Sequence, residues 1–162
     1  MITNQPFGAL PDGRLVTLYT IQNTCGESVE LLDFGASLHS VFVRDASGAI
    51  DDIVLGVGSA AELGGFTSEG ATYGRCANRV AFGRYEFDGK IIQLETDASG
   101  HFLHSVSGNY AYRLFKGEIN EAEQTVSFFV YENGEGGFGC AADAVVHYRF
   151  DDDHRLEIRY EI

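Results

Sequence analysis

The chain has 162 residues, of which 44% are apolar and 12% aromatic, so it can bury one hydrophobic core and is too short for two comfortable domains. Its formal net charge of −13 repels phosphate backbones and argues against nucleic acid as a partner. No run approaches the roughly 18 apolar residues of a membrane span, so we expect no membrane partner either.

Cysteine usage and the first residues predict the compartment. The three cysteines, Cys25, Cys76 and Cys140, are odd in number and show no CxxC spacing, which fits a reducing compartment better than a disulfide framework. The start of the chain contains neither a basic segment nor an apolar one, so it does not resemble a secretory signal. We therefore expect a cytoplasmic protein.

Taken in chain order, strand patterns dominate. Strands are predicted at 14–23, 28–34, 37–44, 50–55, 84–87, 90–94, 111–117, 125–131, 142–150 and 155–162. The turn sequences "PDG", "CGES", "DASG" (twice) and "DDDH" separate them, and "GSAAELGG" can hold one short turn of helix. Short strands at a spacing of about 8–12 residues predict an all-β antiparallel sandwich or barrel.

Two segments give more specific structural predictions. Asp88-Gly89 lies between two β-prone runs and predicts a hairpin with a type I′ turn. At the end of the chain, Leu156, Ile158, Tyr160 and Ile162 alternate with charged residues, a period-two strand with one buried face. Such a face needs a partner surface. We expect that the chain is a fragment, or that it self-associates through this carboxyl-terminal strand.

Two motifs with possible ligand chemistry are better explained as connections. "GEGGFG" at 134–139 matches G-x-G-x-x-G, but a strand pattern follows it where a dinucleotide site requires a helix. A glycine-rich loop between strands is the favoured interpretation. "DDDH" at 151–154 is interpreted as a solvated turn rather than a set of metal ligands.

Among the histidines and cysteines, most are best explained as structural residues, and one loop contains candidates for function. His39 and His147 fall within strands and are expected to be half-exposed, and Cys76 is expected to be a buried, inert thiol. "HFLHS" differs, because it places His101 and His104 in a loop between strands, where functional side chains are often held. A histidine there can hydrogen-bond a sugar hydroxyl or move a proton near neutral pH, although many loop histidines do neither.

Several pieces then line up in order: "DFGASLHSVFVRDASGAIDDIVLG", "YGRCANRVAFGRYEFDGKIIQL", "LHS", "NGEGGFG" and "LEIRYEI". Together they resemble the amino-terminal half of the aldose 1-epimerases, also called galactose mutarotases. The resemblance covers roughly residues 14 to 162, and "GR.ANR…G…DG" is its most specific block. It implies an incomplete galactose mutarotase-like antiparallel β-sandwich, with residues 1–162 as the amino-terminal part of a single domain.

The resemblance also assigns site residues. By position, Arg79 and His104 become substrate-binding residues in a hexose cleft, with Asn78 as a weaker candidate, and His104 is the catalytic candidate within this chain. The alternative for Arg79 is a structural arginine that pins loop carbonyls. Departures from the family pattern affect the shape of the loops, and so the sugar preference. Ser105 and Val106 replace the glycines of "LHGG", and His101 stands where the family often has asparagine.

Mutarotation interconverts α and β anomers of hexoses such as galactose or glucose, and it requires an acid and a base on opposite sides of the ring. In this family these are a histidine in a "TNHSYFN"-like segment and a glutamate near the carboxyl terminus, and neither motif occurs here. We therefore expect the isolated chain to be inactive, with a hexose as its partner and no cofactor or metal. The alternatives are a non-catalytic carbohydrate-binding β-sandwich and an unrelated all-β module.

Overall fold

The computed structural model describes residues 1–64 and 68–162. Its strands are β1 (Ile2–Ala9), β2 (Leu15–Gln22), β3 (Ser28–Leu32), β4 (Ser37–Arg44), β5 (Ile50–Asp52), β6 (Arg79–Val80), β7 (Arg84–Phe87), β8 (Lys90–Gln93), β9 (Phe102–Leu103), β10 (Lys116–Asn120), β11 (Thr125–Glu132), β12 (Ala142–Phe150) and β13 (Leu156–Glu161). Short 3₁₀ turns lie at η1 (Ala60–Glu62), η2 (Ala81–Gly83), η3 (Val106–Gly108), η4 (Tyr110–Tyr112) and η5 (Glu135–Gly137). None of the described helices is long and apolar enough to cross a membrane.

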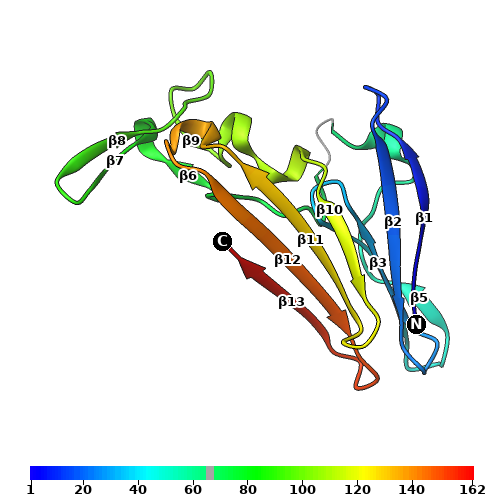
Figure 1. The fold of residues 1–162 in the computed structure, drawn as a ribbon. Coiled ribbons are helices and arrows are strands. Elements are labelled where there is room, and N and C mark those ends of the chain that lie inside the picture. The colour runs from blue at the N-terminus through cyan, green and yellow to red at the C-terminus, as the bar shows by residue number, and fades with distance from the viewer. Residues whose placement is uncertain (65–67) are drawn as a thin grey trace.

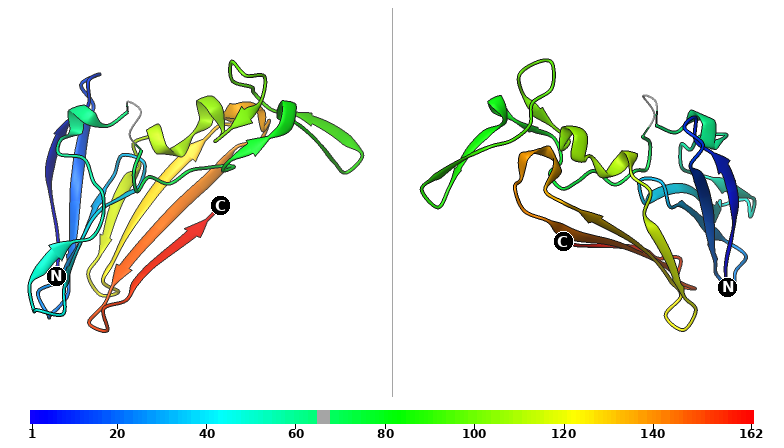
Figure 2. Two further views of the ribbon diagram at one scale, coloured as in Figure 1. Left: turned by 180° about the vertical axis from the view of Figure 1, so that it is seen from behind. Right: turned by 45° about the horizontal axis from the view of Figure 1, so that its top comes forward.

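Two antiparallel sheets make up the body of the molecule. One has the strand order β1-β2-β3-β4-β5 and the other β10-β11-β12-β13. Figure 1 shows the two sheets side by side, with the carboxyl terminus on the outer strand β13. The β7–β8 hairpin projects away from both, as the two further views in Figure 2 also show. The predicted all-β antiparallel fold is confirmed.

The sequence placed most strands well, but it missed β1 and the two-residue strands β6 and β9 and misplaced the start of one strand. The bounds of β4, β7 and β12 agree with the prediction, and Asp88 and Gly89 have φ angles of 50° and 68°, as a type I′ turn requires. The predicted strand at 111–117 is wrong over its first five residues: the side chain of Asn109 accepts from the Ala111 amide and caps η4, and β10 begins only at Lys116. β1 was missed because Pro6 and polar residues interrupt its pattern; it is an edge strand with an irregularity at Pro6, where proline is tolerated.

The core lies between the two sheets. Tyr19 of β2 packs edge-on against Phe128 of β11, with ring centroids 5.3 Å apart, and Phe128 meets Tyr148 of β12 at 6.0 Å. Other buried members from both sheets are Ile21, Val29, Leu31, Val126, Val146 and Phe150. These side chains alternate along their strands, so each sheet turns one apolar face inward. The opposite face of the five-stranded sheet carries a second buried apolar cluster, made up of Leu10, Val16, Leu18, Leu32, Phe34, Ala60 and Leu63.

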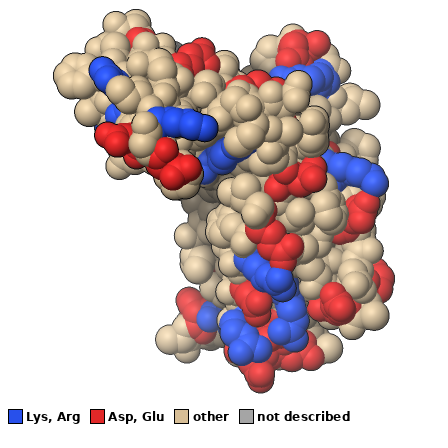
Figure 3. Space-filling model, turned by 60° about the vertical axis from the view of Figure 1, so that its left-hand side comes forward, with Lys and Arg blue, Asp and Glu red and all other residues tan. Residues whose placement is uncertain are grey.

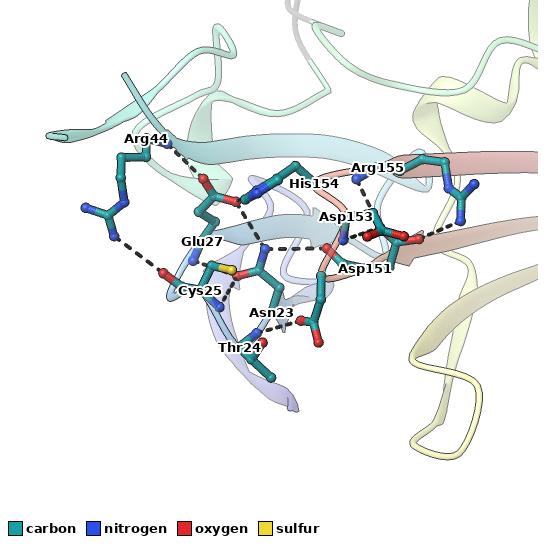
Figure 4. Close-up of polar contacts among 10 residues, drawn as sticks. Asn23, Thr24, Cys25, Glu27, Arg44, Asp151, Asp153, His154 and Arg155 are labelled. Atoms are coloured by element: carbon teal, nitrogen blue, oxygen red, sulfur yellow. Dashed lines mark hydrogen bonds and ion pairs between the residues drawn. The ribbon is translucent and has the colours of Figure 1, made fainter. Parts of the chain in front are cut away.

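A polar cluster joins the sheets where the β2–β3 and β12–β13 turns meet (Figure 4). Asp152 accepts a hydrogen bond from the Thr24 amide at 2.8 Å. Asp151 accepts from the amides of Asp153 and Arg155, each at 3.1 Å, and so orders its own turn. The interpretation of "DDDH" as turn chemistry is confirmed, and the turn also docks one sheet onto the other.

At the centre of this cluster lies the buried carboxylate of Glu27. It accepts from His154 Nδ1 at 2.5 Å, from the Asn23 side chain at 3.1 Å and from the Arg44 amide at 3.1 Å. The hydrogen bond from His154, followed by that from the Arg44 backbone, lowers the pKa of Glu27 from 4.5 to about 2. The ionised form therefore stabilises the folded chain.

Replacing Glu27 by glutamine should make the stability less sensitive to acid. Because the folded-state pKa is depressed, the contribution of Glu27 is complete above about pH 4.5 and is lost as the pH falls toward about 2. We expect Glu27→Gln to be less stable than the native chain near neutral pH, with the difference shrinking over that interval. Urea denaturation at several pH values measures it, with the exposed Glu121→Gln as control. A difference that stays constant with pH would contradict the assignment.

Candidate functional site

A short ladder brings together the two segments that the sequence singled out. β6 pairs with β9 in antiparallel fashion, so that Arg79 lies opposite Leu103. The His104 amide extends the ladder by donating to the Asn78 carbonyl at 3.0 Å. Because paired strands lie about 4.8 Å apart, the backbones of Asn78, Arg79 and His104 share one small stretch of sheet.

Both loop histidines direct Nδ1 toward the backbone of the opposite segment. His104 Nδ1 accepts from the Asn78 N–H at 3.0 Å, and His101 Nδ1 accepts from the Phe82 N–H at 3.0 Å. The two bonds flank the β6–β9 ladder, one at each end. Two histidines of "HFLHS" therefore position the loop, which the sequence alone did not reveal.

These bonds decide what the His104 ring can do. An Nδ1 atom that accepts from an N–H carries no proton, so the neutral ring holds its proton on Nε2. The ring also lies against Tyr73, with centroids 4.3 Å apart. His104 can thus offer one Nε2–H donor to a hydroxyl, whereas a second proton on Nδ1 would break the bond from Asn78. This geometry suits a residue that orients a ligand better than one that stores a proton for transfer.

Asn78 owes its position to its backbone. Its φ angle is 64°, in the left-handed region that asparagine tolerates better than most residues. In this conformation both its N–H and its carbonyl face His104. The residue is exposed, and contact between its side-chain amide and a sugar stays a prediction.

The sequence left two roles open for Arg79, sugar binding and the pinning of loop carbonyls. In the structure it is Arg75 that pins a loop. Arg75, with its side chain only 16% exposed, forms an ion pair with the buried Glu132 and donates to the Cys140 carbonyl at 2.7 Å. Its guanidinium also lies 4.7 Å from the ring centroid of Phe138. Arg75 is therefore the arginine that pins the 132–140 loop, a role that sequence reasoning overlooked although "GR" stands in the motif.

Arg79, by contrast, is exposed, and its guanidinium makes no ion pair or hydrogen bond within residues 1–64 and 68–162. The ladder places its backbone beside that of His104. Convergence of the two side chains on one hexose stays a prediction. A rigid strand pair that carries an unused guanidinium is nevertheless a suitable platform for hydroxyl groups, since the guanidinium has several fixed donors.

The loop at His104 is conformationally strained. His104, Ser105 and Val106 have φ angles of 51°, 63° and 44°, values that residues other than glycine and asparagine seldom adopt. The buried Ser105 hydroxyl accepts from the Cys76 amide at 3.0 Å and donates to the Cys76 carbonyl at 3.2 Å. Ser105 thus fastens the strained loop to the segment that leads into Asn78.

An apolar cavity of about 280 Å³ adjoins the Tyr73 side of the site. Its walls come from Tyr73, Gly74 and Tyr110 on one side and from β12 and the end of β13 on the other. A Cβ atom on Gly74 would lie 2.3 Å from the Tyr110 ring, so only glycine allows this close approach. Burial raises the pKa of the Tyr110 phenol, although the nearby Arg75 opposes the shift.

The remaining sequence candidates fall outside this site. His39 and His147 are half-buried strand residues, as predicted. Cys76 is half-buried rather than buried, because it lies in an irregular segment near the surface and not in a strand facing the core. "GEGGFG" forms η5 and the loop between β11 and β12, which confirms the interpretation as an inter-strand connection.

The fold places the chain in a known structural class. A solved aldose epimerase homologue from C. elegans superimposes on 88% of this chain and 44% of its own length with a TM-score of 0.79, at 32% identity. The molecule is therefore a galactose mutarotase-like β-sandwich. The family model for aldose 1-epimerase matches residues 17–162, and the chain belongs to that family.

Curated relatives agree with this placement and show how much of them the chain covers. Aldose 1-epimerase of Escherichia coli (strain K12) is 33% identical over 165 residues, which is 97% of this chain and 46% of that enzyme. Galactose mutarotase of the mouse is 31% identical over 156 residues, or 93% and 44%. The chain thus spans somewhat less than half the length of these relatives. An unrelated all-β module is no longer an alternative.

The Arg75–Glu132 pair gives a direct stability test. Glu132→Gln should leave the guanidinium buried without its counter-charge, which typically costs about 3–5 kcal/mol. Glu118→Gln is the matched control, because it removes an exposed pair with Lys116 at 2.7 Å and should cost less than about 1 kcal/mol. Chemical denaturation measures both. Equal effects of the two substitutions would show that the buried pair does not hold the loop.

Proposed function

We propose that the chain binds a hexose such as galactose or glucose at the β6–β9 ladder, and that Arg79 and His104 position it for interconversion of its α and β anomers. One observation carries this proposal. The ladder holds a guanidinium without a partner among the described residues next to a histidine whose Nε2–H is left to donate. Membership of the aldose 1-epimerase family supports the class of ligand.

Within that reaction, the residues of this chain would bind and orient the sugar. Ring opening needs a base that takes the proton of the anomeric hydroxyl and an acid that protonates the ring oxygen. In the described part of the chain, the contacts of the His104 ring are with Asn78 and Tyr73, and no carboxylate is among them. We infer that residues 1–162 are the amino-terminal part of a single catalytic domain and lack the acid/base pair.

The second candidate function is a non-catalytic carbohydrate-binding β-sandwich. It is favoured by the Nδ1 bond of His104, because a ring committed to the backbone orients a hydroxyl without exchanging a proton. Both candidates predict sugar binding and no turnover by residues 1–162 alone, and they differ in whether the bound sugar is oriented for catalysis by a longer protein. Binding and turnover therefore have to be measured separately.

Substitutions in the ladder should weaken sugar binding. Arg79→Ala removes a charged donor, worth about 1.5–3 kcal/mol, and should lower the affinity for galactose or glucose roughly ten- to a hundredfold. His104→Ala removes a neutral donor and should lower it roughly two- to tenfold. Isothermal titration calorimetry measures both, with Arg14→Ala on the distant β1–β2 turn as control. Unchanged affinity in both variants would remove the proposed role of the ladder.

The isolated chain should not accelerate mutarotation. Polarimetry of freshly dissolved α-glucose or α-galactose follows the approach to anomeric equilibrium directly. Because the acid/base pair is expected to be absent, the rate with the 162-residue chain should equal that of buffer. A rate well above buffer would contradict this expectation and would require an acid and a base within these residues.

A further inference from the structure

The β6–β9 ladder is a separate two-stranded sheet that is only two residue pairs long. Arg79 pairs with Leu103, and Val80 pairs with Phe102. A two-stranded ribbon is marginally stable when it depends on its backbone alone, and this one is very short. Contacts at the two ends of the ladder therefore decide whether it stays formed.

The two residues that flank β6 are bound in the same way. Asn78 precedes the strand with a φ angle of 64°, and Phe82 follows Ala81 with a φ angle of 56°, so both interrupt the extended backbone. The Asn78 N–H donates to His104 Nδ1 and the Phe82 N–H donates to His101 Nδ1, each at 3.0 Å. Each imidazole thus takes the place that a carbonyl has in a regular ladder. We call these two bonds the histidine clasp.

The end of the ladder at His101 depends most on its imidazole. At the other end, the His104 N–H also donates to the Asn78 carbonyl at 3.0 Å, so a backbone bond supports the ring bond there. Phe82 meets His101 through the ring bond and through a contact of the two rings, whose centroids lie 5.0 Å apart. The Phe82 carbonyl is held from β8 instead, by the Gln93 side chain at 3.2 Å. Loss of the His101 bond would therefore free this end first.

An imidazole can accept these bonds only while it is neutral. Nδ1 accepts an N–H through its lone pair, and a proton on that nitrogen turns it into a donor. Imidazoles ordinarily take up this proton between about pH 5 and 8. Protonation of either ring would set two N–H groups against each other and would remove the clasp at that end of the ladder.

Asp97 is the carboxylate that acts on His101. It accepts from the amides of Ser99 at 2.8 Å and His101 at 3.4 Å. The hydrogen bond from the Ser99 side chain holds the pKa of Asp97 below its usual range, so Asp97 stays anionic at pH 5 and favours the protonated imidazole. The other titratable or charged residues on the segments around the two rings are Tyr73, Cys76, Arg79, Arg84, Glu95 and Glu135. Figure 3 looks toward the side from which the β7–β8 hairpin projects and shows cationic and anionic side chains together on that upper part of the surface.

We propose that His101 is a positioning residue: with His104 it holds the β6–β9 ladder closed while both rings are neutral, and acid opens the ladder from the His101 end. Arg79 lies between the two clasped positions, so opening releases the strand that carries it. The clasp is made of contacts within the described residues alone. Its effect on a bound sugar rests on the proposed function.

Amide hydrogen exchange followed by NMR tests the clasp at single residues. Between pH 7.5 and pH 5 the protection of the Phe82 amide, corrected for intrinsic exchange, should fall roughly tenfold or more, because a released imidazole titrates near its ordinary value of about 6.5. The Leu94 amide, which donates to the Gly83 carbonyl at 2.7 Å, is the internal reference. The contribution of Glu27 to stability is complete above about pH 4.5 and stays constant over this interval. Constant protection at Phe82, or an equal fall at Leu94, would overturn the proposal.

Two substitutions separate titration from simple loss of the contact. His101→Asn keeps an acceptor, because an amide oxygen can take the place of Nδ1 and does not titrate. Phe82 should then stay protected at pH 5, while Asn78, opposite the unchanged His104, still loses protection. His101→Ala should lose the protection of Phe82 at both pH values, and circular dichroism checks that each variant folds. Native pH dependence at Phe82 in His101→Asn, or native protection at pH 7.5 in His101→Ala, would contradict the clasp.

Calorimetry with galactose at the same two pH values reads the positioning of Arg79. The affinity of the native chain should fall in acid, and it should fall less in His101→Asn, where of the two rings only His104 still titrates. Equal falls in both chains would show that His101 does not position Arg79. Absence of binding at both pH values would refute the proposed function and with it the effect on sugar, whereas the exchange measurements decide the clasp without any sugar.

Discussion

The buried ion pair between Arg75 and Glu132 is the interaction on which the candidate site depends. A guanidinium and a carboxylate removed from water are tolerated only where nearly all of their charge is compensated. Glu132 meets this condition through two backbone amides of the following loop in addition to Arg75. Because Arg75 stands a few residues before Asn78, the same pair fixes the 132–140 loop to the segment that enters the β6–β9 ladder.

Hydrogen bonds around the β6–β9 ladder maintain a strained backbone at His104, Ser105 and Val106. Positive φ angles at three consecutive non-glycine residues cost roughly 1–3 kcal/mol each and persist only where the surroundings impose them. The buried Ser105 hydroxyl and the Asn78 amide are the groups that impose them here, one on each side of His104. The strained backbone therefore holds the His104 ring where its Nδ1 meets the Asn78 N–H.

The parts of the fold that the sequence predicted are those where one side of a strand is buried. β12 could be located to the residue because Ala144, Val146, Tyr148 and Phe150 alternate without interruption. The two-residue strands β6 and β9 are too short to show any period, and their pairing depends on a loop that closes over many residues. The resemblance pointed to Arg79 and His104, but nothing in the sequence distinguishes Arg75, whose role is set by a buried carboxylate far along the chain.

Two arginines of one motif thus illustrate how a binding group can be told from a structural one. Arg75 directs its two terminal nitrogens to Glu132 and Cys140, so removing it would unbalance a buried charge before any ligand is considered. Arg79, four positions later, carries the same guanidinium group. Its side chain is exposed and has no partner in the described residues, and its backbone belongs to the paired strand β6. A ligand hydroxyl would meet donors that give up no internal partner on binding, while ordering the exposed side chain would cost about 0.5–1.5 kcal/mol. If sugar recognition does reside in the ladder, Arg79 rather than Arg75 is the arginine of this motif that is left to supply it.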